Sequence, residues 1–192
     1  MRVTPTRLPE VLLIEPVIHS DERGWFFEAF RDERWAEHGL PTNFRQDNAS
    51  RSKRGVLRGL HYQLQHPQGK LISCISGSAF DVAVDIRLGS PTFGAWIGIE
   101  LTWDKPQLLW IPPGFAHGFY ARSDATVIQY KCTDVYVPWD DHGILWCDPE
   151  LKIEWPAQAP FLSPRDRDLP TLRQARANLP HYTAAFAKDS AR

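Results

Sequence analysis

The sequence predicts an all-β sandwich or barrel. Short segments rich in branched and aromatic residues recur along the middle of the chain, and turns containing glycine or proline separate them at intervals of about ten residues. Segment 80–87 (FDVAVDIR) alternates polar and apolar side chains with a period of two, which indicates a strand with one wet and one dry face. We therefore expect sheets joined by short turns, with helices only at the periphery.

The N-terminal part is expected to form two strands and a helix. A strand over 11–18 is interrupted by Pro16, which favours an edge or bulge position because proline has no backbone N–H to donate. An aromatic strand over 25–30 follows a polar turn. Segment 31–38 has helix-forming composition and stops at Gly39, so we expect a short surface helix there.

The remainder of the chain is expected to contain most of the strands. Segment 44–52 is polar, and we interpret it as irregular. Prolines become dense after residue 148, which predicts an extended tail that wraps the barrel, with a short helix over 171–179 and a frayed end. Strands are expected over 70–76, 80–87, 95–102, 108–111, 115–121 and 126–132.

Composition and charge exclude several classes of protein. The formal net charge of −1 gives no overall attraction for nucleic acid or for an acidic membrane. No apolar run approaches the roughly 20 residues of a membrane span, and the N-terminus lacks the apolar core of a signal peptide. Three cysteines without metal-binding spacing are typical of free thiols in a reducing compartment. We expect a soluble, cytoplasmic protein with no nucleic-acid or membrane partner.

The stretch RGVLRGLHYQLQHPQGK concentrates residues that can do chemistry. On a regular strand Arg58 and His61 lie on opposite faces, unless a bend at Gly55 or Gly59 brings them together. A histidine with fixed positive charge nearby, including Lys70, suits proton abstraction from an anionic substrate. The competing interpretation is a hydrogen-bonded structural histidine.

Other kinds of site find little support in the spacing of residues. His61, His66 and His117 do not form the closely spaced pair with a third histidine that metal-binding jelly rolls carry, so we expect no metal. The chain also lacks a nucleophile elbow and both glycine-rich phosphate-binding motifs.

General acid–base chemistry remains as the working hypothesis. His61 can serve as the base, and Tyr130 can serve as an acid if it faces the same cavity. From spacing alone, Tyr130 is equally compatible with half-buried packing. Asp166, in LSPRD, is by itself interpreted as a turn cap.

Long blocks of the sequence resemble the dTDP-4-dehydrorhamnose 3,5-epimerase family. These blocks are DERGWFFEAF, FRQDNASRSKRGVLRGLHYQ, the Gly69-Lys70-Leu71 step, FDVAVDIR with TFGAW, WIPPGFAHGF, YKCTDVY and the closing LSPRD. The resemblance covers the chain from about Pro9 to Asp168. It implies a single cupin-type β jelly-roll domain over 1–192, with a core over about 9–168 and a C-terminal tail over 169–192.

The resemblance also implies an activity. The implied substrate is dTDP-4-dehydro-6-deoxy-D-glucose, inverted at carbons 3 and 5 to dTDP-4-dehydro-L-rhamnose on the route to dTDP-L-rhamnose. It implies a homodimer that needs neither a metal nor an organic cofactor. By match to the family's motifs, His61 is the proton acceptor, Asp166 the carboxylate that orients it, Tyr130 the proton donor and Lys70 a cation beside the sugar.

Further positions match substrate-binding residues of the family. Tyr136 falls on the aromatic residue that stacks on thymine. Asp141 stands where relatives often carry a glutamate, and Arg165 replaces a common lysine, which keeps the charge but changes the hydrogen-bond geometry. The implied binding residues are Arg23, Phe26, Glu28, Gln46, Asp47, Asn48, Arg58, His117, Tyr136 and Asp141.

Three other functions stay open at this point. An epimerase acting only at carbon 3 or only at carbon 5 would use the same residues with a different placement of the sugar. A metal-dependent cupin enzyme would be revealed by metal analysis. A non-catalytic nucleotide-sugar binding module would have no need of His61, Tyr130 and Asp166 together.

Overall fold

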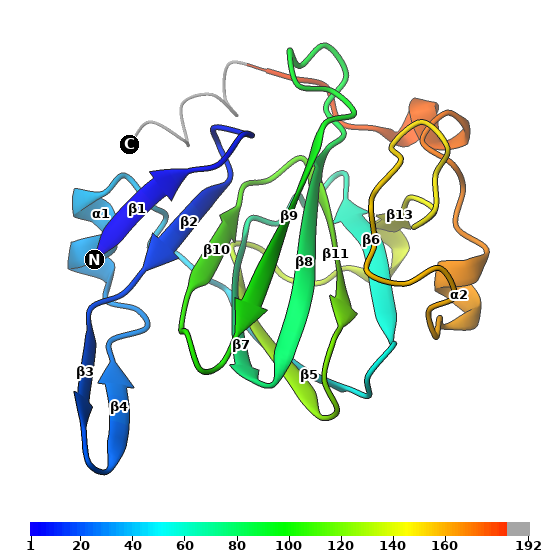
Figure 1. Ribbon diagram of the computed structural model, residues 1–192. Helices are drawn as coiled ribbons and strands as arrows, with labels where there is room; N and C mark the ends of the chain where they lie inside the picture. The colour runs from blue at the N-terminus through cyan, green and yellow to red at the C-terminus, as the bar shows by residue number, and fades with distance from the viewer. Residues whose placement is uncertain (184–192) are drawn as a thin grey trace.

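Two antiparallel sheets face each other in the computed structural model, which describes residues 1–183 (Figure 1). The larger sheet has the strand order β1 (Arg2–Pro5), β2 (Leu12–Glu15), β10 (Leu108–Ile111), β7 (Lys70–Ser76), β12 (Thr126–Cys132) and β5 (Gln46–Ser52). The smaller sheet has the order β13 (Asp141–Gly143), β6 (Leu57–Gln63), β11 (Phe115–Ala121), β8 (Ser78–Asp85) and β9 (Trp96–Thr102). The predicted jelly roll is confirmed.

Apolar side chains fill the space between the sheets. Ile72, Leu109 and Ile128 of the larger sheet meet Ala83 and Phe119 of the smaller one, and all are at least 97% buried. This packing supplies the main hydrophobic stabilisation of the fold and holds the two sheets at a fixed separation.

The chain after β13 covers the outer face of the smaller sheet. Val82 and Val84 of β8 point outward and pack against Ile144, Leu151 and Leu172. The expectation that one face of segment 80–87 is exposed to solvent is therefore wrong. The tail buries one face, and the other face lies in the barrel interior. Asp81 and Asp85, which suggested that wet face, are both fully buried.

Helices are few and peripheral, as expected. Helix α1 (Asp32–Glu37) confirms the helix expected over 31–38, and its Trp35 packs on the outer face of the larger sheet. Helix α2 (Pro164–Arg167) and the 3₁₀ turn η1 (Pro138–Asp140) flank the smaller sheet, and the helix expected over 171–179 is a shorter 3₁₀ turn, η2 (Gln174–Asn178). No helix in the described part of the chain is long and apolar enough to cross a membrane.

Two expectations near the N-terminus need correction. The strand expected over 11–18 is divided at Pro16 into β2 and β3 (Ile18–Asp21), and the aromatic strand β4 (Gly24–Phe27) ends earlier than 25–30. Segment 44–52 is not irregular, since β5 occupies most of it. The frayed end expected for the tail lies outside the described residues.

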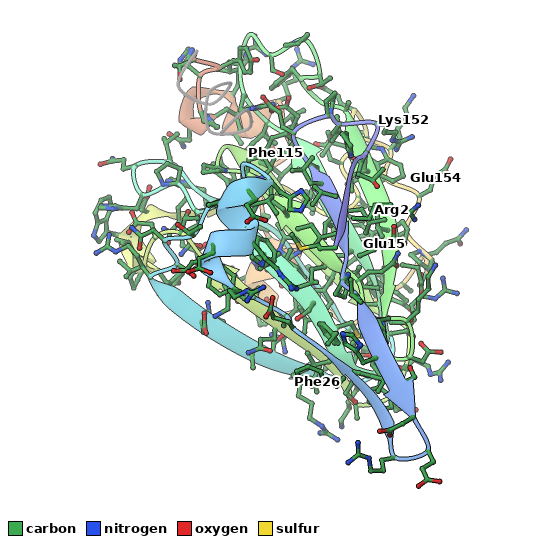
Figure 2. All side chains as sticks on the ribbon, turned by 90° about the vertical axis from the view of Figure 1, so that its left-hand side faces the viewer. Arg2, Glu15, Phe26, Phe115, Lys152 and Glu154 are labelled. Atoms are coloured by element: carbon green, nitrogen blue, oxygen red, sulfur yellow. The ribbon has the colours of Figure 1, made fainter. Side chains whose placement is uncertain are left out.

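Strands β3 and β4 form a separate hairpin. It pairs only with itself and lies, in Figure 1, on the opposite side of the molecule from β6 and α2. Phe26, labelled in Figure 2, is 69% exposed on this hairpin, whereas Arg2 and Glu15 lie together on the adjoining strands β1 and β2. An exposed aromatic side chain on a projecting hairpin suits contact with another molecule.

Candidate active site

A cavity of about 470 Å³ opens between the two sheets. Strands β6 and β11 form one wall, β5, β7 and β12 form the other, and α2 with the segment around β13 borders the mouth. It gathers ten of the residues expected from the sequence, namely Gln46, Asn48, Arg58, His61, Lys70, His117, Tyr130, Tyr136, Asp141 and Asp166.

His61 and Asp166 form a short hydrogen bond inside the cavity. The distance from Nε2 of His61 to Oδ1 of Asp166 is 2.6 Å, although the two residues are 105 positions apart in the sequence. Because Asp166 accepts at Nε2, the lone pair of a neutral His61 is on Nδ1. That nitrogen is then able to accept a proton.

Asp166 is held in place by the start of helix α2. The hydroxyl of Ser163, the N-cap residue, accepts a hydrogen bond from the backbone N–H of Asp166 at 3.0 Å, and Pro164 occupies the first turn. The turn-cap interpretation of Asp166 is thus wrong, since Ser163 is the cap. Burial raises the pKa of the Asp166 carboxyl, but hydrogen bonds from His61 and Ser163 outweigh burial and keep that pKa below its usual range.

A bulge brings Arg58 and His61 to the same wall. His61 pairs with His117 and Arg58 with Phe119, so three steps along β6 match two steps along β11. Gly59 lies in the extra step with a φ of +119°, and a Cβ there would meet the Cα of Gly118 at 2.7 Å. The bend that the sequence allowed at Gly59 is confirmed.

Tyr130 and Lys70 occupy the opposite wall. They come from the neighbouring strands β12 and β7 of the larger sheet, whereas His61 comes from the smaller one. Burial raises the pKa of the Tyr130 phenol, which therefore keeps its proton near neutral pH. Burial lowers the pKa of Lys70, with Cys132, Asp141 and Asp81 acting in the opposite direction.

A polar network closes one side of the mouth. The Tyr136 hydroxyl donates to Oδ2 of Asp141 at 2.9 Å, and Nη1 of Arg165 lies 2.5 Å from the same oxygen. The backbone N–H of Tyr136 donates to the side chain of Gln46 at 2.7 Å. These contacts fix an aromatic ring, 48% exposed, at the entrance.

Four of the expected residues lie outside the cavity. Arg23 pairs with Asp21 on the hairpin, where Phe26 also lies. Glu28 pairs with two arginines, at 3.4 Å and 3.2 Å, and Asp47 points outward to Lys131 at 2.8 Å. Within one chain, these side chains do not join the others.

Several residues in the cavity or directly behind it were not expected from the sequence. Asp81 is hydrogen-bonded to His117, which faces the cavity. The alternating polar residues of segment 80–87 could have identified Asp81, but they were expected to face solvent. Further lining residues are Ser50, Gln63, Gln68 and Ser163, and Arg165, already noted in the sequence at a position where relatives often carry lysine, also lines the cavity.

The described structure contains no cluster of candidate metal ligands. Within residues 1–183, no group of three or more His, Cys, Asp and Glu side chains is placed to hold a metal ion. The chemistry available to this cavity is proton transfer by its own side chains and stabilisation of negative charge by Lys70 and Arg58.

The fold and the cavity together define a cupin-type acid–base enzyme, with a histidine–carboxylate pair facing a tyrosine and a lysine. The sequence profile of the family described as dTDP-4-dehydrorhamnose 3,5-epimerase matches residues 5–174. The chain belongs to this family.

Individual relatives agree with this assignment. The chain is 51% identical to the dTDP-4-dehydrorhamnose 3,5-epimerase of Pseudomonas aeruginosa, over 87% of this chain and 93% of the relative. A crystal structure of dTDP-6-deoxy-D-glucose-3,5-epimerase from Legionella pneumophila, in complex with dTDP-4-keto-L-rhamnose, matches with a TM-score of 0.91 and 49% identity, over 95% of this chain and 98% of that one. The dTDP-4-dehydrorhamnose 3-epimerase of Streptomyces niveus is 40% identical, over 97% of this chain and 92% of the relative.

Proposed function

We propose that this chain inverts carbons 3 and 5 of dTDP-4-dehydro-6-deoxy-D-glucose and yields dTDP-4-dehydro-L-rhamnose for dTDP-L-rhamnose biosynthesis. The observation that carries the proposal is the placement of the His61–Asp166 pair on one wall and of Tyr130 and Lys70 on the other. Family membership selects the substrate, and this geometry accounts for the reaction.

The first step is removal of a proton by His61. The ketone at carbon 4 acidifies the hydrogens on carbons 3 and 5, so one base can serve both centres. Nδ1 of His61 takes the proton, and Asp166 stabilises the imidazolium that forms while it keeps the ring oriented. A positioned base of this kind contributes a rate factor of about 10²–10⁴.

The enolate that results carries its negative charge on the oxygen at carbon 4. Lys70 is the proposed donor to that oxygen, and removal of one such preorganised donor typically costs about 3–4 kcal/mol in the transition state. Tyr130 returns a proton from the opposite wall, which inverts the carbon. Once His61 has released its proton to solvent and Tyr130 has regained one, the same steps at the second carbon complete the reaction.

The nucleotide is proposed to occupy the mouth of the cavity. The exposed ring of Tyr136 offers a stacking surface for thymine, and Asp141 with Arg165 holds it in place. Arg58 provides a local positive charge for the diphosphate in a chain with almost no net charge. Gln46 and Asn48 supply further polar contacts there, and His117 is proposed to contact the sugar deeper in the cavity, beside His61.

We further propose that two copies of the chain form a homodimer in which each hairpin serves the other copy's cavity. Arg23, Phe26 and Glu28 are remote from the cavity of their own chain, yet they match substrate-binding positions of the family. The exposed Trp25 and Phe26 offer an apolar contact surface. If each hairpin reached the cavity of the other copy, its residues would be remote from their own cavity and still contact substrate.

A cytoplasmic location is also proposed. Cys74, Cys132 and Cys147 are free thiols in the described structure. Unpaired cysteines are typical of a reducing compartment.

A second candidate is epimerisation at carbon 3 alone. The observation that favours it is the full-length similarity to the 3-epimerase of Streptomyces niveus. The same fold and the same side chains would serve this reaction with the sugar held in a single orientation.

A deuterium-exchange experiment separates the candidates. Purified, chelator-treated protein is mixed with dTDP-4-dehydro-6-deoxy-D-glucose in heavy water and followed by NMR. Label and inversion at both carbons support the double epimerase. Label and inversion at carbon 3 alone support the second candidate, and no exchange at either carbon contradicts both.

A further inference from the structure

A second histidine–carboxylate pair lies behind the cavity. Nε2 of His117 is 3.0 Å from each carboxylate oxygen of Asp81. Asp81 is fully buried on β8, and it shares the inner face of that strand with Ala83, which belongs to the core between the sheets. Within residues 1–183, its carboxylate has no other side-chain hydrogen-bond partner.

A buried carboxylate with a single hydrogen-bonding side chain is an expensive way to stabilise a fold. Removing it from water costs several kcal/mol, and replacing a buried ion pair with apolar side chains is often neutral or stabilising. Its position beside an apolar core would readily accept such a side chain. Packing alone therefore does not explain Asp81, and its effect on His117 offers a reason for it.

Asp81 determines which nitrogen of His117 meets the cavity. Because a carboxylate only accepts hydrogen bonds, Nε2 carries a proton. Nδ1 of His117 has no hydrogen-bond partner in the described structure. It is also not fully buried, so it is open to the cavity that His117 lines. It is thus the atom that meets a bound sugar nucleotide.

His117 stands directly beside the proposed base. It pairs across β11 and β6 with His61, and facing residues on neighbouring strands have Cβ atoms about 4.5–5.5 Å apart. The charge of Asp81 also reaches the other wall, where it acts against the burial that lowers the pKa of Lys70. One buried carboxylate therefore influences polar groups on both walls of the cavity.

We propose that Asp81 is a positioning residue for the epimerisation, which acts by holding the Nε2–H form of His117 so that Nδ1 faces the sugar. This inference rests on the proposed function. It assigns to the reaction a residue that touches neither the substrate nor the base.

A double-mutant cycle tests the inference. Asp81→Asn keeps the volume and removes the charge, and we expect kcat to fall about 10–100-fold, by analogy with loss of the partner that orients a metal-bound histidine. The affinity for dTDP, which lacks the sugar, stays unchanged. In a His117→Asn background the same substitution has little further effect, because its target is gone. Asp148→Asn, another buried carboxylate that accepts backbone N–H groups far from the cavity, lowers the Tm and leaves kcat unchanged.

The outcomes separate this inference from the proposed function. An inactive wild-type protein contradicts the proposed function. If the wild type is active and Asp81→Asn leaves kcat unchanged, the role of Asp81 is overturned. The role is also overturned if Asp81→Asn lowers kcat by the same factor in the His117→Asn background as in the wild type.

A second measurement remains available even if Asp81→Asn fails to fold. Nitrogen-15 NMR of wild-type protein, with His117 assigned by its loss in His117→Asn, reports which ring nitrogen is protonated. A proton on Nε2 supports the inference, and a proton on Nδ1 alone overturns it.

Discussion

Individual side chains of the cavity have separate tasks in the proposed reaction. His61 removes one proton from the carbon on one wall and Tyr130 donates its own proton from the other, so loss of either should interrupt the reaction at a different stage. This division makes substitutions of the two residues distinguishable by experiment.

His61→Ala should abolish turnover while leaving nucleotide binding intact. The loss of a positioned base predicts a fall in kcat of at least about 10²–10⁴-fold, because no other group is aligned with Asp166. Turnover by NMR and dTDP affinity by calorimetry are the measurements. His38→Ala, at the exposed end of α1, is the matched control and should be fully active. Substantial activity in His61→Ala would refute His61 as the base.

Tyr130→Phe should stop inversion but still permit exchange of substrate hydrogen with solvent. The phenyl ring fills the same space, His61 still forms the enolate, and only the proton donor is missing. Deuterium incorporation and product formation are followed in one sample. Tyr120→Phe, on β11 outside the cavity, should behave like wild type. If Tyr130→Phe inverts carbon at the normal rate, Tyr130 only packs.

The alignment of β6 with β11 depends on glycine. Gly59→Ala should lower both stability and activity, because the new Cβ would lie 2.7 Å from the backbone of Gly118 and would separate His61 from His117. Gly89→Ala is the matched control, since Gly89 also has a positive φ but has no atom within 4 Å of a Cβ. Both variants should lose about 1–2 kcal/mol of stability, because alanine is strained at a positive φ. The additional loss in Gly59→Ala should measure the cost of the contact between the new Cβ and Gly118. Thermal unfolding and kcat test this, and equal effects would contradict it.

The 3₁₀ turn η1 stabilises the loop after β6 through Asp140. Its carboxylate accepts backbone hydrogen bonds from Leu64, Gln65 and His66 at 2.7–3.2 Å. Burial raises the pKa of Asp140, but these N–H groups outweigh burial and hold the pKa below its usual range. A carboxyl group with a depressed pKa stabilises the folded state at pH values above its pKa in the unfolded chain, which is about 4. This stabilisation is lost as the pH falls through the pKa in the folded state.

Asp140→Asn should therefore lower stability at pH 7 by about 2 kcal/mol, the usual value of hydrogen bonds to a charged group. It should also make the Tm less sensitive to acid below about pH 5 than in wild type. Thermal unfolding across pH tests both. Asp124→Asn, at an exposed position, should leave the curve unchanged, and an identical acid slope in Asp140→Asn would contradict the prediction.

Strand β5 shows where prediction of elements from sequence stops. The apolar strands were predictable because their side chains face the core. Gln46, Asn48 and Ser50 of β5 face a polar cavity, while Asp47 and Arg51 face solvent, so both faces are polar and no alternation is visible. The same cause hid Asp81, whose polarity indicated solvent when it actually faces the interior. A polar cavity reverses the rule that polar residues lie outside.

At the scale of the whole molecule, the resemblance predicted which residues match the family but not which of them would share one cavity. His61, Asp166, Lys70 and Tyr130 converge as expected. Arg23 and Phe26 do not, because β3 and β4 form a separate hairpin that contributes no residue to the cavity of the same chain. Their exposure in a single chain became visible only in three dimensions.

The proposed exchange of hairpins predicts complementation between two inactive variants. Arg23→Ala damages the hairpin and His61→Ala the cavity, so in a mixed dimer one cavity carries both defects and the other carries none. Mixing the two purified variants under conditions of subunit exchange should restore activity. Mixing His61→Ala with Lys70→Ala, which damage the same cavity, is the matched control. Light scattering establishes the dimer, and failure of the first pair to complement in a demonstrated mixed dimer contradicts hairpin exchange.

The separation of 105 residues between His61 and Asp166 also has a consequence for synthesis of the protein. A ribosome completes both walls of the cavity when β12 emerges, well before it reaches α2. Until then His61 lacks Asp166 to orient it, and the outer face of the smaller sheet is covered only by the residues that precede α2, such as Ile144 and Leu151. The growing chain thus completes both walls of the cavity before it can form the His61–Asp166 pair, and a product released before α2 would lack the proposed base in its oriented form.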